Sequence, residues 1–178
     1  SLKGSEDPEV ALIKNNLATS YHSLNKLDEA EKLYNESLRV FRKHFGNYHL
    51  RVSSSLNNLA FIYIYKEDNQ KALPLLKESL EIKRTILGDN HPDLIQSYSN
   101  VGSAYFNLKD YVNAEKFMIA SLDVGLKNYD GDNINLSRTY MWYGRVLDGM
   151  KNFKKSVYYQ EKSYLIRKRE LGQKNKLT

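Results

Sequence analysis

The sequence contains no cysteine, only three prolines and nine glycines, and no hydrophobic run long enough to cross a membrane. Without cysteine the chain forms no disulfide and has no thiol chemistry, which suits a reducing compartment, and we expect a cytoplasmic location. So little proline and glycine in 178 residues argues against a strand-rich fold with many turns. The content of 41% hydrophobic and 27% charged residues is ordinary for a soluble protein with a sizeable core. Composition therefore favours a soluble fold of long helices.

The common catalytic and metal-binding motifs are also missing. There is no glycine-rich phosphate loop, no His-Glu-x-x-His motif and no cluster of cysteine and histidine, and the four histidines are scattered along the chain. We therefore expect no enzymatic activity, no catalytic residues, no metal site and no cofactor.

Positive charge is concentrated towards the C-terminal end of the sequence. From Arg138 onward there are 11 Lys and Arg residues against 3 Asp and Glu, whereas residues 1–137 have 16 against 18. A basic region of this kind can meet nucleic acid, an acidic lipid surface or an acidic partner, or it can be a solvated outer face. We favour the solvated face, and nucleic acid is not the partner that we expect.

One pattern recurs four times along the chain with a period of 42 residues and no insertion. The stretch 56–92 meets a copy of itself around Asn15 and Leu17 upstream, and around Asn100 and Val101 downstream. Self-similarity at a fixed period is the sequence sign of a stacked repeat array. We expect a single array over residues 1–178, with repeats at about 8–49, 50–91, 92–133 and 134–175.

Each repeat is expected to form two helices. Apolar or small residues recur at i, i+3, i+4 and i+7, as Leu56, Leu59, Ala60 and Tyr63 do in the second repeat, and this is helical spacing. The predicted fold is all-α: an α–α superhelix of four helix-turn-helix repeats with eight main helices. The first helices are predicted at 9–24, 51–66, 93–108 and 135–150, and the second helices at 27–45, 69–87, 111–128 and 153–171.

Small residues occupy three equivalent positions in every repeat. A small side chain lets the paired helix approach closely, and a larger residue there should overpack the contact at a cost of roughly 1–3 kcal/mol. The three columns are Ala18, Ala60, Gly102 and Gly144; Ala30, Ala72, Ala114 and Ser156; and Ser37, Ser79, Ser121 and Ser163.

Glycine and histidine mark the borders of the repeats. Gly46, Gly88 and Gly172 follow predicted second helices, where glycine can adopt the left-handed conformation that ends a helix. His49 and His91 stand just before first helices, and we interpret them as part of this punctuation rather than as ligands. Only residues 172–178 follow the last repeat, which is too short for a capping helix, so we expect the chain to be a fragment of a longer protein.

The repeat resembles a known family. A stripe leucine followed by Ala or Gly, a Tyr three residues on, an Ala nine further and a small residue seven beyond that is similar to the tetratricopeptide repeat (TPR), whose usual period is about 34 residues. The 42-residue period, with its Asn-Asn-Leu-Ala and Leu-Gly-Asp-Asn-His-Pro segments, resembles the kinesin light chain type. The resemblance covers residues 8–172.

The resemblance implies that the first helices line a concave groove. Asn16, Asn58 and Asn100 would form a ladder in it, because related proteins use an Asn at this place to hold the backbone of a ligand; the alternative is that these amides bridge neighbouring helices. Aromatic residues there either form pockets or belong to the core, and two arginines seven positions apart could pair with an acidic ligand residue or a carboxylate. The implied groove residues are Asn15, Asn16, Thr19, Asn57, Asn58, Phe61, Asn100, Ser103, Phe106, Arg138, Trp142 and Arg145.

Three functions are compatible with these observations. The resemblance implies first a non-enzymatic protein–protein interaction module that binds a peptide segment, with acidic residues, as a kinesin light chain-like cargo adaptor or scaffold. One alternative is a regulatory TPR domain of a signalling or transcription protein, and another is a basic surface that binds an acidic partner, lipid or nucleic acid. Chaperone-binding relatives clamp a C-terminal carboxylate with Lys, Arg and Asn, whereas this chain has Thr19, His22, Ser99 and Ser103 at those places. The uncapped last repeat also suggests self-association.

Overall fold

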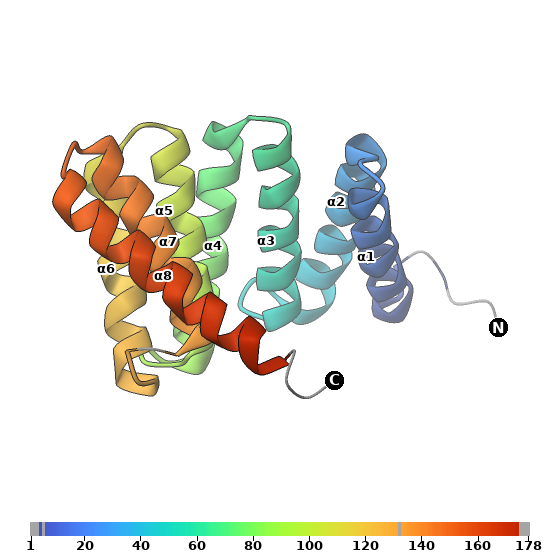
Figure 1. Ribbon diagram of the computed structural model, residues 1–178. Coiled ribbons are helices and arrows are strands. Elements are labelled where there is room, and N and C mark those ends of the chain that lie inside the picture. Colours follow the sequence, from blue (N-terminus) through green and yellow to red (C-terminus); the bar gives the residue numbers. More distant parts are fainter. Residues whose placement is uncertain (1–3, 5, 132, 175–178) are drawn as a thin grey trace. The chain divides into compact units, whose positions relative to one another are not determined.

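The computed structural model describes residues 4, 6–131 and 133–174, and within these residues it contains eight α-helices and no strand. Figure 1 shows the helices along the chain. The predicted all-α fold of four helix pairs is confirmed. The helices are α1 (Pro8–Ser23), α2 (Leu27–Phe45), α3 (Leu50–Tyr65), α4 (Asn69–Leu87), α5 (Asp93–Asn107), α6 (Tyr111–Asn128), α7 (Ile134–Gly149) and α8 (Phe153–Lys174).

The ends of the helices agree with the predicted spans to within one residue, except at the end of α8. This helix does not stop before Gly172 but continues to Lys174, so the predicted end was wrong. Glycine permits a helix to end but does not force it to, and a helical glycine costs only about 1 kcal/mol relative to alanine. Gly46 and Gly88 do follow helix ends, with φ of 77° and 83°. Their ψ angles of 178° and 159° are extended rather than left-handed helical. This combination of positive φ and extended ψ is essentially restricted to glycine.

The turn inside each repeat has a feature that the sequence did not predict. Asn25, Glu67, Lys109 and Lys151 all have positive φ, between 58° and 62°, and they stand at the same position of the four repeats. Three of these four residues are types that rarely adopt this conformation. The tight connection between the paired helices imposes it, and Glu and Lys carry no sequence signal for such a turn.

The starts of the first helices are capped by side chains. The Nδ1 atom of His49 accepts a hydrogen bond from the backbone N–H of Arg51 at 3.1 Å, and Nδ1 of His91 accepts one from that of Asp93 at 3.2 Å. These bonds satisfy backbone donors that have no partner within the helix. Both histidines therefore mark repeat borders, as their positions in the sequence indicated.

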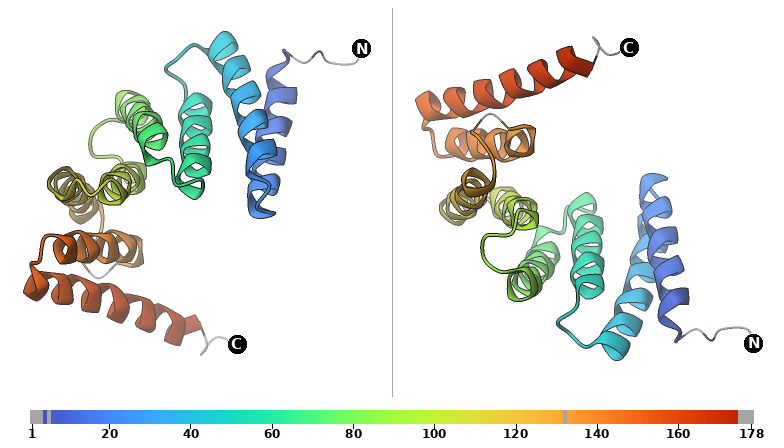
Figure 2. Two further views of the ribbon diagram at one scale, coloured as in Figure 1. Left: turned by 90° about the horizontal axis from the view of Figure 1, so that it is seen from above. Right: turned by 90° about the horizontal axis from the view of Figure 1, so that it is seen from below.

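The chain divides into two compact units, Ser1–Gly88 and Asp89–Thr178, which we call unit 1 and unit 2. Each unit contains two helix pairs. In unit 1, α2 packs on both α1 and α3, and α3 packs on α4; in unit 2, α6 packs on both α5 and α7, and α7 packs on α8 (Figure 2). Each unit thus contains one complete junction between consecutive repeats.

A buried serine joins the two helices in three of the four repeats. The hydroxyl of Ser79 donates to the backbone carbonyl of Ser53 at 2.8 Å, and Ser121 donates to that of Ile95 at 2.8 Å. Ser163 makes the equivalent bond in the last repeat. The sequence predicted only that a small side chain stands here; the structure adds that it is a hydrogen-bond donor between helices.

The glycines of the first small-residue column lie directly against the paired helix. A Cβ atom on Gly102 would come within 3.3 Å of the Ala114 carbonyl oxygen, and one on Gly144 within 3.2 Å of the Ser156 carbonyl oxygen. Backbone atoms cannot move aside as a flexible side chain can. The predicted close approach of the paired helices is confirmed at both positions.

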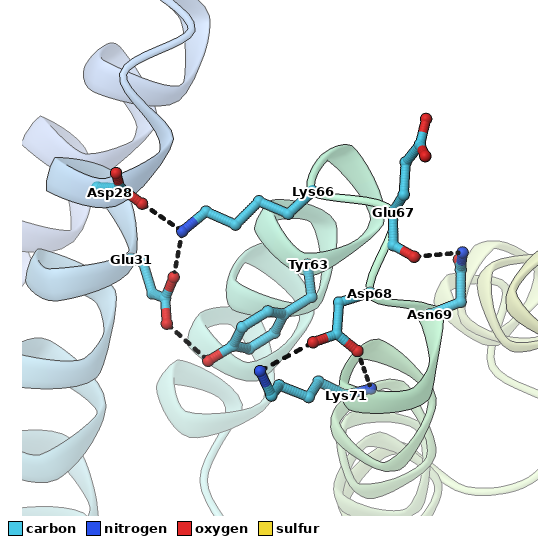
Figure 3. Close-up of polar contacts among 8 residues, drawn as sticks. All are labelled: Asp28, Glu31, Tyr63, Lys66, Glu67, Asp68, Asn69 and Lys71. Atoms are coloured by element: carbon cyan, nitrogen blue, oxygen red, sulfur yellow. Dashed lines mark hydrogen bonds and ion pairs between the residues drawn. The ribbon is translucent and has the colours of Figure 1, made fainter.

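A polar network joins the two repeats of unit 1 (Figure 3). Lys66 Nζ donates to Asp28 Oδ1 at 2.5 Å and to Glu31 Oε2 at 2.6 Å, and the hydroxyl of Tyr63 donates to Glu31 Oε1 at 2.8 Å. Burial raises the pKa of Glu31, but the hydrogen bonds from Lys66 and Tyr63 outweigh it, and the pKa is lowered overall. The carboxylate of Glu31 is therefore an acceptor shared by two groups of the next repeat.

We expect the stability of unit 1 to fall as the pH rises above about 10. Burial, and then the hydrogen bond to Glu31 and its charge, raise the pKa of Tyr63 to about 12, whereas an unfolded tyrosine has a pKa of about 10. Between these values the unfolded state has lost the proton and the folded state retains it, so unfolding becomes easier with rising pH. Urea unfolding at pH 8 to 12, followed by circular dichroism, should show a smaller loss in Tyr63→Phe. Parallel losses in the two proteins would contradict this.

Candidate functional site

In unit 1 the predicted groove residues lie on α1 and α3 but form few contacts with one another. Asn15 bridges the two helices, because its Oδ1 accepts a hydrogen bond from the Ser55 hydroxyl at 3.0 Å. Within the described residues, the side-chain amides of Asn16 and Asn58 make no hydrogen bond. Phe61 is half-buried on α3.

Thr19 is turned towards its own paired helix. Its hydroxyl lies 2.9 Å from the hydroxyl of Tyr34 on α2 and 3.2 Å from the carbonyl oxygen of Asn15. Tyr34 is buried, and burial raises the pKa of its hydroxyl group. The Thr19 hydroxyl thus helps to satisfy a buried tyrosine within the first repeat.

In unit 2, α5 and α7 bring the predicted residues together. Asn100 is only 5% exposed, and its Oδ1 accepts a hydrogen bond from Arg138 Nη2 at 3.3 Å. The hydroxyl of Ser103, also buried, donates to the backbone carbonyl of Asn100 at 2.9 Å. In this conformation Asn100 bridges neighbouring helices, which is the alternative that the sequence left open.

One helical turn further along, α5 and α7 form an aromatic and cationic cluster. The rings of Phe106 and Trp142 meet edge to face with centroids 5.8 Å apart. The guanidinium of Arg145 lies 4.5 Å from the centroid of Trp142 and 5.2 Å from that of Phe106, within the range of a cation–π interaction. The cluster holds Arg145 in place while its side chain stays exposed.

A cavity of about 210 Å³ opens beside Arg138. Its wall includes residues from the first turns of α5 and α7, where the helix dipoles favour negative charge. Asp93 also lines it, and no ion pair joins Asp93 to Arg138 among the residues that the structure describes. The remaining wall residues are Pro92, Ile95, Gln96, Ser99, Tyr129, Asn135 and Thr139.

Arg138 is an uncompensated cation in this wall. Burial, and next the positive charge of Arg167, lower the pKa of Arg138. No carboxylate among the described residues lies within ion-pair distance of its guanidinium. A carboxylate of a ligand would stabilise this partly buried charge, because the guanidinium has no carboxylate partner in the chain.

Sequence reasoning missed the hydroxyl groups behind this cavity. Ser99, Ser121 and Thr139 form a triangle of hydrogen bonds, with oxygen–oxygen distances of 2.8 to 3.0 Å. The triangle fixes the spacing of α5 and α7 next to Arg138. The available signal was the recurrence of serine at the position of Ser121 in every repeat, which predicted packing rather than a network.

The described part of the chain contains neither a metal-binding cluster nor a membrane-spanning helix. No three or more His, Cys, Asp or Glu side chains gather there as a metal site requires. None of the helices found there has both the length and the hydrophobicity of a membrane span.

The sequence profile of the tetratricopeptide repeat family matches residues 9–85, 52–108 and 93–169. No curated protein sequence matches the chain. Among solved structures it is similar to BtubC (BKLC) from P. vanneervenii, with a TM-score of 0.84 and 23% identity over 93% of this chain and 66% of that one. It is also similar to a candidate kinesin light chain of nearly identical TPR-like repeats from Podosopora anserina, with a TM-score of 0.81 and 18% identity over 95% of this chain and 80% of that one.

The apo form of RapI is a third similar structure, with a TM-score of 0.82 and 19% identity over 99% of this chain and 61% of that chain. The chain thus spans slightly less than two thirds of the length of BtubC and RapI. At these identities the similarity concerns the fold, and together with the profile match it confirms the predicted TPR-type fold. It indicates no catalytic family.

Proposed function

We propose that this chain, which belongs to the tetratricopeptide repeat family, binds a peptide segment of a partner protein through an acidic side chain or carboxylate held by Arg138. The family and fold support a protein–protein interaction module. Our proposal adds to this that the ligand is a peptide and that it carries an acidic group. The observation that carries them is the cavity in unit 2, with a cation in its wall and no carboxylate paired to it.

The groups around Arg138 suit a ligand of mixed character. A carboxylate entering the cavity would meet the guanidinium and the N-terminal ends of α5 and α7. An apolar or aromatic neighbour on the same peptide could pack against Phe106 and Trp142, beside the guanidinium of Arg145. The ligand class that fits is an acidic peptide with an aromatic residue or leucine nearby.

The asparagines of unit 1 offer a separate contact to a peptide backbone. An Asn amide donates to and accepts from a peptide backbone at once, and the side-chain amides of Asn16 and Asn58 have no partner within the described residues. We propose that they hold the ligand backbone, as an adaptor or scaffold of the kinesin light chain type would require. A regulatory domain that binds a peptide would use the same residues.

A peptide array screened with the purified chain tests the proposal. Peptides that pair an acidic residue with an aromatic residue or leucine should be enriched among the hits, and replacing Asp and Glu by Asn and Gln should remove them. Binding of the hits is then measured by fluorescence anisotropy over a range of salt concentrations. A groove that holds apolar side chains loses affinity modestly with salt, whereas a basic surface loses it steeply and linearly in log–log form.

The array and the salt series together decide between the functions. Absence of hits, or equal binding to any polyanion with a steep salt dependence, would reject the peptide site in favour of the basic surface formed by the residues after Arg138. Peptides that still bind at high salt but do not need their Asp or Glu residues would reject the role of Arg138. They would leave the peptide-binding function itself intact.

We also propose that the chain associates with itself through its last repeat. Tyr164 is 60% exposed, and Val157 and Leu171 on the same face of α8 are exposed as well. Spacings of seven residues place the three on one stripe of the helix. An apolar stripe of this kind is expected to be covered by another surface.

A further inference from the structure

The first helix of the chain exposes the face that equivalent helices bury. Leu59 of α3 packs against α2, and Tyr143, at the same repeat position of α7, is buried as well. Their counterpart on α1 is Leu17, which is 45% exposed, and Ile13 and Leu24 on the same stripe are 66% and 68% exposed. Ile13 and Leu17 of α1, together with Leu24 directly after its end, form a face that we call the head face. It has the position of a junction but no covering helix among the described residues.

The surface that would pack against such a head face at a junction lies on α8. In unit 1 the junction is made by the side of α2 that carries Glu31, Leu38 and Phe41. The same positions three repeats later are Val157, Tyr164 and Arg167. We call this side of α8, which Leu171 extends, the tail face.

We propose that a second copy of this chain docks head to tail, with its head face on the tail face of the first copy. This inference rests on the self-association that we propose for α8. It adds that the tail face of one copy contacts the head face of another. The two junctions inside the units define how the copies would align. A contact of unit 1 is transferred to the interface by a shift of three repeats, and a contact of unit 2 by a shift of one repeat. Three such pairs can be compared.

The first pair joins neighbouring first helices. In unit 1 the Ser55 hydroxyl donates to the amide oxygen Oδ1 of Asn15 at 3.0 Å. The equivalent pair in unit 2 is formed by the hydroxyl groups of Ser99 and Thr139, 2.8 Å apart. Between two copies the equivalent residues are Met141 of one chain and Ile13 of the other. A polar pair inside the chain thus becomes an apolar pair between chains, with both members changed together.

The second pair joins a second helix to the next first helix. In unit 2 the Tyr143 hydroxyl donates to Glu115 Oε1 at 3.1 Å. In unit 1 the equivalent acceptor, Glu31, is bonded instead by Tyr63, one turn further along its helix than the counterpart of Tyr143. Between copies the residues at the Glu115 and Tyr143 positions are Val157 and Leu17. In the register of unit 2 an acidic acceptor and its tyrosine donor are replaced by two apolar side chains, whereas the donor position of unit 1 keeps a tyrosine, Tyr21.

The third pair involves charge. In unit 1 the guanidinium of Arg51 lies 5.8 Å from the centroid of the Phe41 ring. Between copies the residues at these positions are Glu9 and Arg167, which have opposite charges. A different protein that binds this chain would need to match only the head face or only the tail face. Docking of two copies explains why the two faces both differ from the inner junctions and why their differences complement each other.

Such an interface is heterologous, because two different surfaces meet, so it can continue beyond a dimer. Two blocked variants separate the surfaces: Ile13→Glu with Leu17→Glu blocks the head face, and Val157→Glu with Tyr164→Glu blocks the tail face. All four side chains are exposed, so the helices should remain folded, which circular dichroism checks. Analytical ultracentrifugation then measures mass against concentration.

The expected result is that the unchanged chain forms species larger than a dimer as its concentration rises. Each blocked variant alone stays monomeric, and a 1:1 mixture forms a heterodimer and nothing larger, because one variant retains the tail face and the other the head face. Glu9→Arg and Arg167→Glu should each weaken association by up to about fivefold, and combining them in one chain should restore it.

Three outcomes would overturn the proposal. The unchanged chain could remain monomeric up to roughly 100 μM, as it would if a further repeat or a different protein covers these faces. A blocked variant could still form a dimer by itself, or the mixture could fail to associate. Peptide binding measured on a chain with both faces blocked is independent of these results, so failure of the peptide site and failure of the junction are distinguishable.

Discussion

Replacing Leu59 by alanine is expected to lower the free energy of unfolding by about 2–5 kcal/mol. Leu59 is 3% exposed and belongs to the core cluster of unit 1, together with Tyr34, Leu38 and Phe41. Truncation removes apolar contacts and leaves a cavity where α3 meets α2, since close-packed helices relax only in part. Urea unfolding followed by circular dichroism measures the loss.

Leu17→Ala is the matched control, because Leu17 has the same repeat position on α1 and the same side chain. It is 45% exposed, so its truncation should cost less than about 1 kcal/mol. The comparison is made at the lowest protein concentration that gives a signal, where a second copy does not cover the head face. Equal losses in the two variants would show that the junction of α2 and α3 is not the core that the structure describes.

The repeat positions predicted most of the fold because packing imposes one pattern on every copy. Spacing at i, i+3, i+4 and i+7 placed seven helices to within a residue, and the small columns predicted the close approach at Gly102 and Gly144. The left-handed turn at Glu67 and Lys109 was not predictable, since its conformation comes from the closure between paired helices and not from the residue type. The inter-helix bonds of Ser79 and Ser121 were also missed, because a small residue and a small donor have the same pattern in the sequence.

The candidate site was predictable in position but not in detail. The register of the repeat placed Phe106, Trp142 and Arg145 on neighbouring first helices, and the structure brings them into contact. The bond between Asn100 and Arg138 depends on side-chain directions that periodicity does not specify. The cavity beside Arg138 depends on how far α5 and α7 separate at their first turns, and no sequence pattern reports that distance.

Replacing Arg138 by glutamine is expected to weaken binding of acidic peptides roughly 10- to 100-fold, the loss of one hydrogen bond between charged groups. Burial already opposes the charged form of Arg138, as its lowered pKa indicates. Removing the charge relieves a desolvation cost, whereas losing the hydrogen bond to Asn100 opposes this gain, so the stability should change by less than about 1 kcal/mol. Affinity should fall while stability changes little, which separates a binding role from a structural one.

Lys155→Gln is the control for charge, because it makes the same change in net charge at an exposed position of α8. It should alter peptide affinity less than about twofold, as exposed charges are screened by solvent and salt. The two variants are titrated with one peptide from the array and with its Glu→Gln form, which completes a double-mutant cycle. If Arg138 holds the carboxylate, the losses from Arg138→Gln and from Glu→Gln in the peptide should not add. Equal weakening by Arg138→Gln and Lys155→Gln would instead indicate a diffuse basic surface, because only a specific pair makes the position of the charge matter.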